Sequence, residues 1–126
     1  MKKIGNTMKN YQGSCHCKNV SFQFQHNEIH SGMRCNCSFC KRKGAVVSDF
    51  VIPPDEFSFE LKEPESLGLY EFDNKVAHHH FCKICGINPF LQTLSKPEHY
   101  RVNLACIDEI NTDAIDITLF DGKNLL

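Results

Sequence analysis

The chain has 126 residues, the length of one domain, and its 14 basic and 15 acidic residues give a formal net charge of −1. This balance argues against a nucleic-acid-binding domain held by phosphate contacts, because such domains carry a marked basic excess. No apolar run reaches the roughly 18 residues of a membrane-spanning helix. The first residues are charged but lack the apolar core of a secretory signal, so we expect a soluble, cytoplasmic protein.

Residues 1–10 are polar, so we expect a flexible N-terminal segment followed by a single domain over residues 11–126. In the rest of the chain apolar and polar side chains alternate over short segments, with the period of two that half-buried strands show. In chain order, the expected strands are residues 20–24, 45–52, 57–61, 68–72, 76–81, 87–92, 100–104 and 115–119. The alternation is clearest in the first, third, seventh and eighth of these segments.

Turn-forming residues separate these segments. They lie at residues 53–54 (Pro-Pro), 73–74 (Asp-Asn) and 121–122 (Asp-Gly). No window keeps a helical period over about ten residues, and at most one short helical turn fits, at residues 108–112. The pattern therefore predicts an all-β domain, mainly antiparallel and with little helix.

Seven of the eight cysteines lie in three tight clusters. The clusters are Cys15 and Cys17, then Cys35, Cys37 and Cys40, and then Cys82 and Cys85. Cytoplasmic thiols stay reduced, so clustered cysteines there are more often metal ligands than disulfides, which are the alternative for an exported chain. A closed zinc site takes four protein ligands and an open, reactive one takes three. Seven thiols therefore predict two zinc ions per chain.

Residues 82–86, Cys-x-x-Cys-Gly, are typical of a zinc knuckle. Gly86 can adopt a positive φ, so that backbone N–H groups point at the sulfurs and stabilise their charge. A redox pair of the thioredoxin type is the alternative. That interpretation requires a βαβ context, which this sequence does not show, so we favour zinc.

The spacing leaves two ways of completing that site. Cys37 and Cys40 can join the third cluster in a ribbon-like site, which leaves Cys15, Cys17 and Cys35 over. Alternatively, the first cluster joins the third, and the second cluster stands as a separate triplet. The second arrangement keeps each cluster intact and is favoured, but the spacing does not decide between them.

Three basic residues, Lys41, Arg42 and Lys43, follow the second cluster directly. Three thiolates and one Zn²⁺ would carry a formal net charge of −1, so this basic run would favour thiolate ligands and attract an anionic substrate. A thiolate-rich site with an open position also suits a sulfur ligand, because both partners are soft. A substrate that carries its own thiol is therefore expected.

Three consecutive histidines, His78, His79 and His80, precede the third cluster. Each is a candidate for a fourth metal ligand, a proton carrier near pH 7, or a polar position beside zinc-bound sulfur. His16 lies between two cysteines and should point away from any metal that they bind. Cys106 is isolated, and we expect a buried, inert thiol there.

Four segments carry motifs that occur together in one known family. Residues 13–22, 35–45, 81–86 and 102–108 match the patterns G-x-C-x-C-x-x-V-x-F, C-x-C-S-x-C-(K/R)-(K/R)-x-G-A, F-C-x-x-C-G and V-N-x-x-C-(L/I)-D. In these patterns the chain resembles the glutathione-dependent formaldehyde-activating enzyme family, which also includes centromere protein V. The resemblance covers roughly residues 11–110 in order.

The resemblance implies a β-tent fold, in which two sheets are pinned by a structural zinc. It implies structural ligands at Cys15, Cys17, Cys82 and Cys85, and a second, catalytic zinc at Cys35, Cys37 and Cys40. The named member of the family condenses glutathione with formaldehyde to S-hydroxymethylglutathione, which is a carbon–sulfur lyase reaction in the reverse sense. Glutathione or a similar thiol is thus implied as the small-molecule partner.

We therefore predict a zinc-dependent carbon–sulfur lyase that acts on a thiol–aldehyde adduct, with no membrane or nucleic-acid partner. The second cluster would bind the thiol as a thiolate, and a nearby histidine or water would move the proton. The alternative is a non-catalytic zinc-binding module that mediates partner binding or senses thiols or zinc.

Overall fold

The structure is a computed structural model that describes residues 8–71, 77–93, 96 and 98–125. In this part of the chain, three sheets are accompanied by two short α-helices and two 3₁₀ turns. The strands are β1 (Lys9–Ser14), β2 (Val20–His26), β3 (Ser31–Cys35), β4 (Phe57–Leu61), β5 (Leu67–Tyr70), β6 (Ala77–Cys82), β7 (Phe90–Thr93), β8 (His99–Val102) and β9 (Asp116–Phe120). The helices are α1 (Ser38–Lys43) and α2 (Gly122–Leu125), and the 3₁₀ turns are η1 (Pro54–Glu56) and η2 (Leu104–Cys106). The prediction of a mainly antiparallel β domain with little helix is confirmed.

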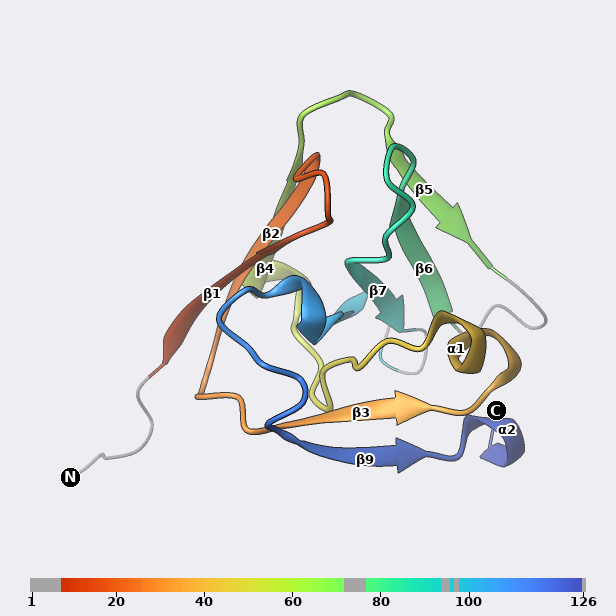
Figure 1. Cartoon of the computed structure of the whole chain (residues 1–126). Coiled ribbons are helices and arrows are strands. Elements are labelled where there is room, and N and C mark those ends of the chain that lie inside the picture. The colour runs from red at the N-terminus through yellow and green to blue at the C-terminus, as the bar shows by residue number, and fades with distance from the viewer. Residues whose placement is uncertain (1–7, 72–76, 94–95, 97, 126) are drawn as a thin grey trace.

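Two antiparallel sheets lean toward each other above a parallel pair of strands (Figure 1). One sheet has the order β1-β2-β4 and the other the order β5-β6-β7-β8. The parallel pair is β3 with β9, in which Ser31 lies opposite Asp116. None of the helices in the described residues has the length and apolar character needed to cross a membrane.

The alternation that predicted β2 also determines which face of the strand is buried. Val20, Phe22 and Phe24 are buried, whereas the polar side chains between them are exposed. The Phe22 ring centroid lies 5.8 Å from that of Phe57 and 6.0 Å from that of Phe90. Rings of this size dominate the apolar area of a small core. Aromatic side chains from β2, β4 and β7 therefore hold the two leaning sheets together.

The segment 45–52 is not a strand, and the prediction of one was wrong. Only isolated bridges occur in it, at Val47 and at Ile52. Val46, Val47 and Ser48 are buried in succession, because this segment crosses the interior instead of lying on the surface of a sheet. A run of buried residues has no polar face and therefore no alternation that identifies a strand.

Four of the strands and α-helices were not expected, namely β1, β3, α1 and α2. β1 begins at Lys9, within the segment for which flexibility was predicted. The sequences of β1 and β3 each contain a glycine and no β-branched residue, so their strand propensity is weak. α1 has six residues, which is too short for a helical period to show in the sequence.

Near the end of the chain one expected strand is shorter than predicted, and one expected turn is present. β8 ends at Val102, two residues before the predicted end, because the Asn103 side chain accepts the Ala105 N–H at 3.1 Å and caps η2. Where a helical turn was considered, the Ile110 N–H closes a single turn on the Ile107 carbonyl at 3.0 Å. Local hydrogen bonds at Asn103 thus end β8 early, whereas the single turn agrees with the expectation of at most one short helical turn.

The remaining expected strands are present: β4 has the predicted ends, and β2, β5, β6, β7 and β9 have shifted ends. β7 begins at Phe90, three residues later than predicted, because the Ile87 carbonyl instead accepts the Cys82 N–H at 2.9 Å. Residues 72–76 lie outside the described residues. They include one end of the expected strands 68–72 and 76–81 and the turn expected at 73–74.

Candidate metal centres

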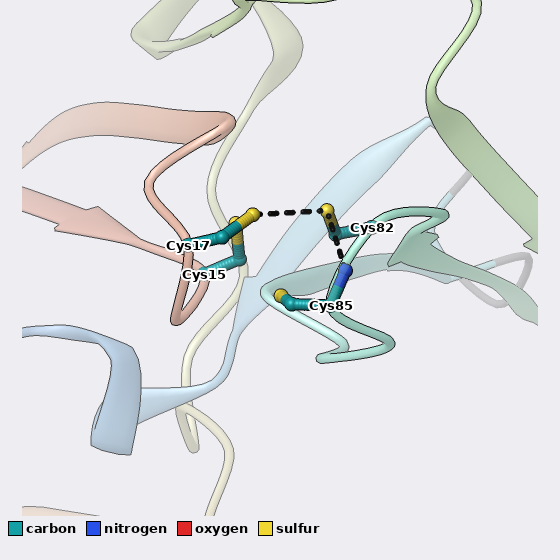
Figure 2. Close-up of side chains that lie close together, drawn as sticks. All are labelled: Cys15, Cys17, Cys82 and Cys85. Carbon is teal, nitrogen blue, oxygen red and sulfur yellow. Dashed lines mark hydrogen bonds between the residues drawn. The ribbon is translucent and has the colours of Figure 1, made fainter.

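The cysteines of the first and third clusters meet where the two leaning sheets approach each other (Figures 1 and 2). Cys15 and Cys17 lie in the turn between β1 and β2, while Cys82 ends β6 and Cys85 lies in the turn after it. Figure 2 shows the side chains of the two turns facing each other. All four Sγ atoms lie within 4.8 Å of one another. Of the two pairings that the spacing left open, the structure brings together the one that joins these two clusters.

The sulfur positions of this four-cysteine group fit a tetrahedral zinc ion. Zn–S bonds of about 2.3 Å place the sulfurs of a tetrahedron roughly 3.8 Å apart. The Sγ atoms of Cys15 and Cys17 are 3.7 Å apart, and those of Cys17 and Cys82 are also 3.7 Å apart. The group therefore has the donor set and the dimensions of a closed metal site.

N–H groups surround the sulfur of Cys82. Its Sγ accepts the backbone N–H of Ile84 at 3.4 Å and of Cys85 at 3.5 Å, and the side-chain amide of Asn19 at 3.6 Å. Burial raises the pKa of this thiol, but the N–H donors outweigh that effect and lower the pKa to about 6. Gly86 has a φ of 84°, as the knuckle motif predicted. The turn thus favours the thiolate, which is the form that binds a metal.

Asn19 carries no motif of its own in the sequence, yet it connects the four-cysteine group to the strands around it. The residue is 4% exposed. Its Nδ2 donates to Ser66 Oγ at 2.7 Å, and its Oδ1 accepts the Glu63 N–H at 2.9 Å. Together with its bond to Cys82, these contacts tie the β1–β2 turn to the β4–β5 connection and to β6. An asparagine next to a cysteine turn is the one feature of the sequence that suggests this role.

The second cluster forms a separate group of three cysteines. Cys35 ends β3, Cys37 is the N-cap of α1, and Cys40 lies within the helix. The Cys37 N–H donates to Cys35 Sγ at 3.5 Å, and the Cys40 N–H donates to Cys37 Sγ at 3.4 Å. The three Sγ atoms lie within 4.8 Å of one another. A short capped helix therefore folds the three thiols around one point, which fits three ligands of a single ion.

The three thiols of this triplet differ in their electrostatic surroundings. Burial raises the pKa of Cys40 to about 12, and the positive charge of Lys43 opposes that shift. Burial acts in the same direction on Cys37, but the N–H groups of Cys40 and Phe39 outweigh it and lower its pKa. The pKa of Cys35 is raised, chiefly by burial. Cys37 is therefore the most readily ionised thiol of the three.

Asn36, between two triplet cysteines, fixes the loop to the last strand and helix. Its backbone N–H donates to the Phe120 carbonyl at 3.2 Å, and its Nδ2 donates to Asp121 Oδ1 at 3.0 Å. Its Oδ1 accepts the Lys123 N–H at 2.8 Å. The segment 35–40, called the triplet loop below, is thus held by residues more than 80 positions away in the sequence. The motif alone did not indicate this arrangement.

In the described part of the chain, no histidine, aspartate or glutamate joins either cysteine group. His78 pairs with Glu71, and the Nε2 of His80 lies 3.0 Å from Gln92 Oε1. His16 is exposed, as expected for a residue between two ligands. The described residues therefore offer the triplet three protein ligands, and the fourth ligand considered among the consecutive histidines is not found.

Phe39 lies within the triplet loop and joins α1 to β5 and β6. Its ring stacks on that of Tyr70, with centroids 5.2 Å apart, and lies 4.3 Å from the ring of His79. His79 is buried, and burial together with the charge of Lys43 lowers its pKa to about 4. The imidazole is therefore neutral at pH 7.

The three basic residues after the triplet do not act as one patch. Lys41 and Arg42 are exposed, and the Arg42 guanidinium donates to the Ser38 carbonyl at 2.8 Å. Lys43 is partly buried, and its ammonium lies 5.6 Å from the centroid of the Phe39 ring. Of the three, only Lys43 is partly buried and lies near the Phe39 ring.

Cys106 belongs to neither cysteine group. Its side chain is partly buried, and burial raises the pKa of the thiol to about 12. At neutral pH the thiol stays protonated and unreactive. The side chain is thus less buried than the sequence predicted, while its raised pKa agrees with the expectation of an inert thiol.

The fold and the two cysteine groups define a small β protein built around two candidate metal centres. The family model of the glutathione-dependent formaldehyde-activating enzyme matches residues 10–121, and the chain belongs to this family. It is also similar to a Rhodobacter sphaeroides protein of known crystal structure, with 33% sequence identity and a TM-score of 0.72. That similarity covers 85% of this chain and 99% of the other. The family resemblance that the cysteine motifs carried is confirmed.

Proposed function

We propose that this protein is a zinc-dependent carbon–sulfur lyase of the cytoplasm that acts on thiol–aldehyde adducts. In the synthetic direction it would join glutathione and formaldehyde to S-hydroxymethylglutathione. The observation that carries this proposal is the division of seven thiols into a group of four and a group of three. The family match supports the choice of formaldehyde and glutathione.

The four-cysteine group is assigned a structural zinc. Cys15, Cys17, Cys82 and Cys85 supply the four sulfur ligands of a closed tetrahedral site. Because two of them come from the β1–β2 turn and two from the end of β6, their joint ligation would hold the two sheets together. In this assignment the four-cysteine group has no catalytic role.

The triplet is assigned the second zinc. Cys35, Cys37 and Cys40 would hold an ion that has a further position for a soft ligand, and the ion would supply Lewis acidity there. The N–H groups at Cys37 favour its thiolate, and Asn36 fixes the loop that carries all three ligands. The chain's part in the reaction is thus to present three sulfurs in a fixed arrangement.

The overall reaction balances without a redox partner. In the synthetic direction the thiol sulfur forms a bond to the aldehyde carbon, the carbonyl π bond is lost, and the thiol proton ends on the oxygen. His79 has a pKa of about 4 and is therefore a weak base at neutral pH. We assign the proton transfer to water, because His78 and His80 are engaged with Glu71 and Gln92.

Exchange spectroscopy tests the proposal. Mixtures of ¹³C-formaldehyde and glutathione form the adduct spontaneously, and NMR measures the exchange rate with and without protein. The wild type, shown by elemental analysis to hold two zinc ions, should accelerate the exchange. Cys37→Ser should return the rate to that of buffer, and Cys106→Ser should leave it unchanged. A two-zinc wild type that leaves the rate at the buffer value would indicate the non-catalytic module instead.

A further inference from the structure

Lys43 differs from the two basic residues that precede it. Lys41 and Arg42 are exposed, whereas Lys43 is partly buried. Residues three and four apart share a face of a helix, so Lys43 lies on the same face of α1 as Cys40 and Phe39. The ammonium lies 5.6 Å from the centroid of the Phe39 ring, which fixes its position beside the triplet.

The sulfurs of the triplet are the main negative groups that act on this ammonium. Burial lowers the pKa of Lys43, while the charges of Cys40, Cys37 and Cys35 each raise it. In the described residues the ion pairs join Lys9 to Glu109 and His78 to Glu71, and none involves Lys43. A partly buried ammonium without a carboxylate partner favours an additional anion close to it.

Aromatic side chains lie next to Lys43 and continue toward the surface. Phe39 covers one side of the ammonium, and the neutral His79 packs against the same ring. Tyr70 extends this aromatic wall to the surface, where its side chain is 47% exposed. The triplet and the ammonium are both carried by the segment from Cys35 to Lys43, so one small thiol could contact the two together.

We propose that Lys43 is a specificity-determining residue that selects thiols carrying a carboxylate. The proposal rests on the proposed function, because it requires that the triplet zinc accepts an external thiol. A carboxylate would pair with Lys43 while the thiol sulfur occupies the further ligand position. A thiol without a carboxylate would gain nothing from the ammonium.

Two thiols that differ in this group provide the test: 3-mercaptopropionate, which carries a carboxylate, and 2-mercaptoethanol, which does not. Titration calorimetry measures the affinity of each for the zinc-loaded protein. In Lys43→Met the affinity for 3-mercaptopropionate should fall about tenfold, as expected for loss of a charged hydrogen bond, while that for 2-mercaptoethanol stays the same. Lys43→Arg should retain most of the preference, because it keeps the charge.

Lys41→Met is the matched control, because it removes the same charge from the exposed side of the same helix. It should leave both affinities unchanged. Equal losses for the two thiols in Lys43→Met, or no loss for either, would overturn the proposal while leaving thiol binding intact. Failure of the wild type to bind either thiol would overturn the proposed function as well. Zinc content and thermal unfolding of each variant establish that the comparison concerns folded, loaded protein.

Discussion

The Sγ atoms of Cys17 and Cys82 lie 3.7 Å apart, although 65 residues separate them in the sequence. The first belongs to the turn after β1 and the second ends β6, so this pair links the two leaning sheets. In a domain of about 126 residues the core is modest, and a metal crosslink at this point would contribute much of the stability.

Replacement of Cys85 by serine tests this link. A structural zinc contributes on the order of 10 kcal/mol of apparent binding energy, which is also folding energy. We therefore expect Cys85→Ser to lose a zinc ion and its cooperative thermal transition, measured by elemental analysis and circular dichroism. Cys106→Ser is the control and should keep both. A cooperative melt in Cys85→Ser at the wild-type temperature would contradict the structural assignment.

The anchoring of the triplet loop predicts a different effect for Asn36. Residues that orient metal ligands typically contribute about 10- to 100-fold to metal affinity. Asn36→Ala loses the contacts to Asp121 and Lys123, so zinc should bind the triplet at least about tenfold more weakly in competition with a chelator. Asn124→Ala removes another bond to Asp121 that does not reach the loop, and it should leave the affinity unchanged.

Asn19 should matter for stability even when zinc is saturating. Its truncation leaves the Glu63 N–H without its acceptor and removes one of the two hydrogen bonds of the buried Ser66 hydroxyl. We expect Asn19→Ala to lower the free energy of unfolding by about 2 kcal/mol in urea titrations. The exposed Asn10, which accepts a hydrogen bond from Gln25 at 2.9 Å, is the comparison, and Asn10→Ala should cost less than about 0.5 kcal/mol. Equal losses in the two variants would argue against the role of Asn19.

The buried His79 makes a prediction about pH. Burial, the charge of Lys43 and the neighbouring His80 and His78 lower its pKa from 6.5 in the unfolded chain to about 4. The folded state therefore favours the neutral imidazole, and this contribution to stability is present above pH 6.5 and is lost as the pH falls toward 4.

His79→Gln removes the titrating group. Between about pH 7.5 and 5.5 the wild type should lose about 1 kcal/mol more unfolding free energy than the variant, measured in urea with saturating zinc. The difference between the two proteins isolates His79, because acid effects on the cysteines are common to both. Parallel pH dependences would show that His79 titrates normally in the folded protein.

The alternation in the sequence identified β2, a strand with one buried and one exposed face. Val20, Phe22 and Phe24 alternate with polar residues, and β2 forms where they lie. The strand prediction for residues 45–52 was wrong because Val46, Val47 and Ser48 are buried in succession. A short buried segment of this kind has the same composition as a central strand. β1 was not predicted because its own residues have weak strand propensity. Its formation depends more on pairing with β2.

The candidate site was predictable in its ligands but less so in its surroundings. Ligand spacing is local, so the clusters that contain Cys37 and Cys85 were visible in the sequence. The partners of Asn36 and Lys43 depend on how distant or neighbouring elements pack, and no motif encodes that packing. The basic run illustrates the limit: three similar residues differ because a helix turns only Lys43 toward Phe39.

Because β3 pairs with β9 near the end of the chain, the two cysteine groups can be completed at different times during synthesis. The last of the four cysteines in the first group is Cys85, whereas the loop of the triplet is anchored by residues up to Lys123. During synthesis the chain can therefore pin its two sheets before β9 has emerged from the ribosome. The triplet loop is fixed later, because the hydrogen bond between Asn36 and Asp121 joins residues far apart in the sequence. A ribosome-bound chain that ends before β9 should accordingly retain zinc in the first group and hold it loosely in the second.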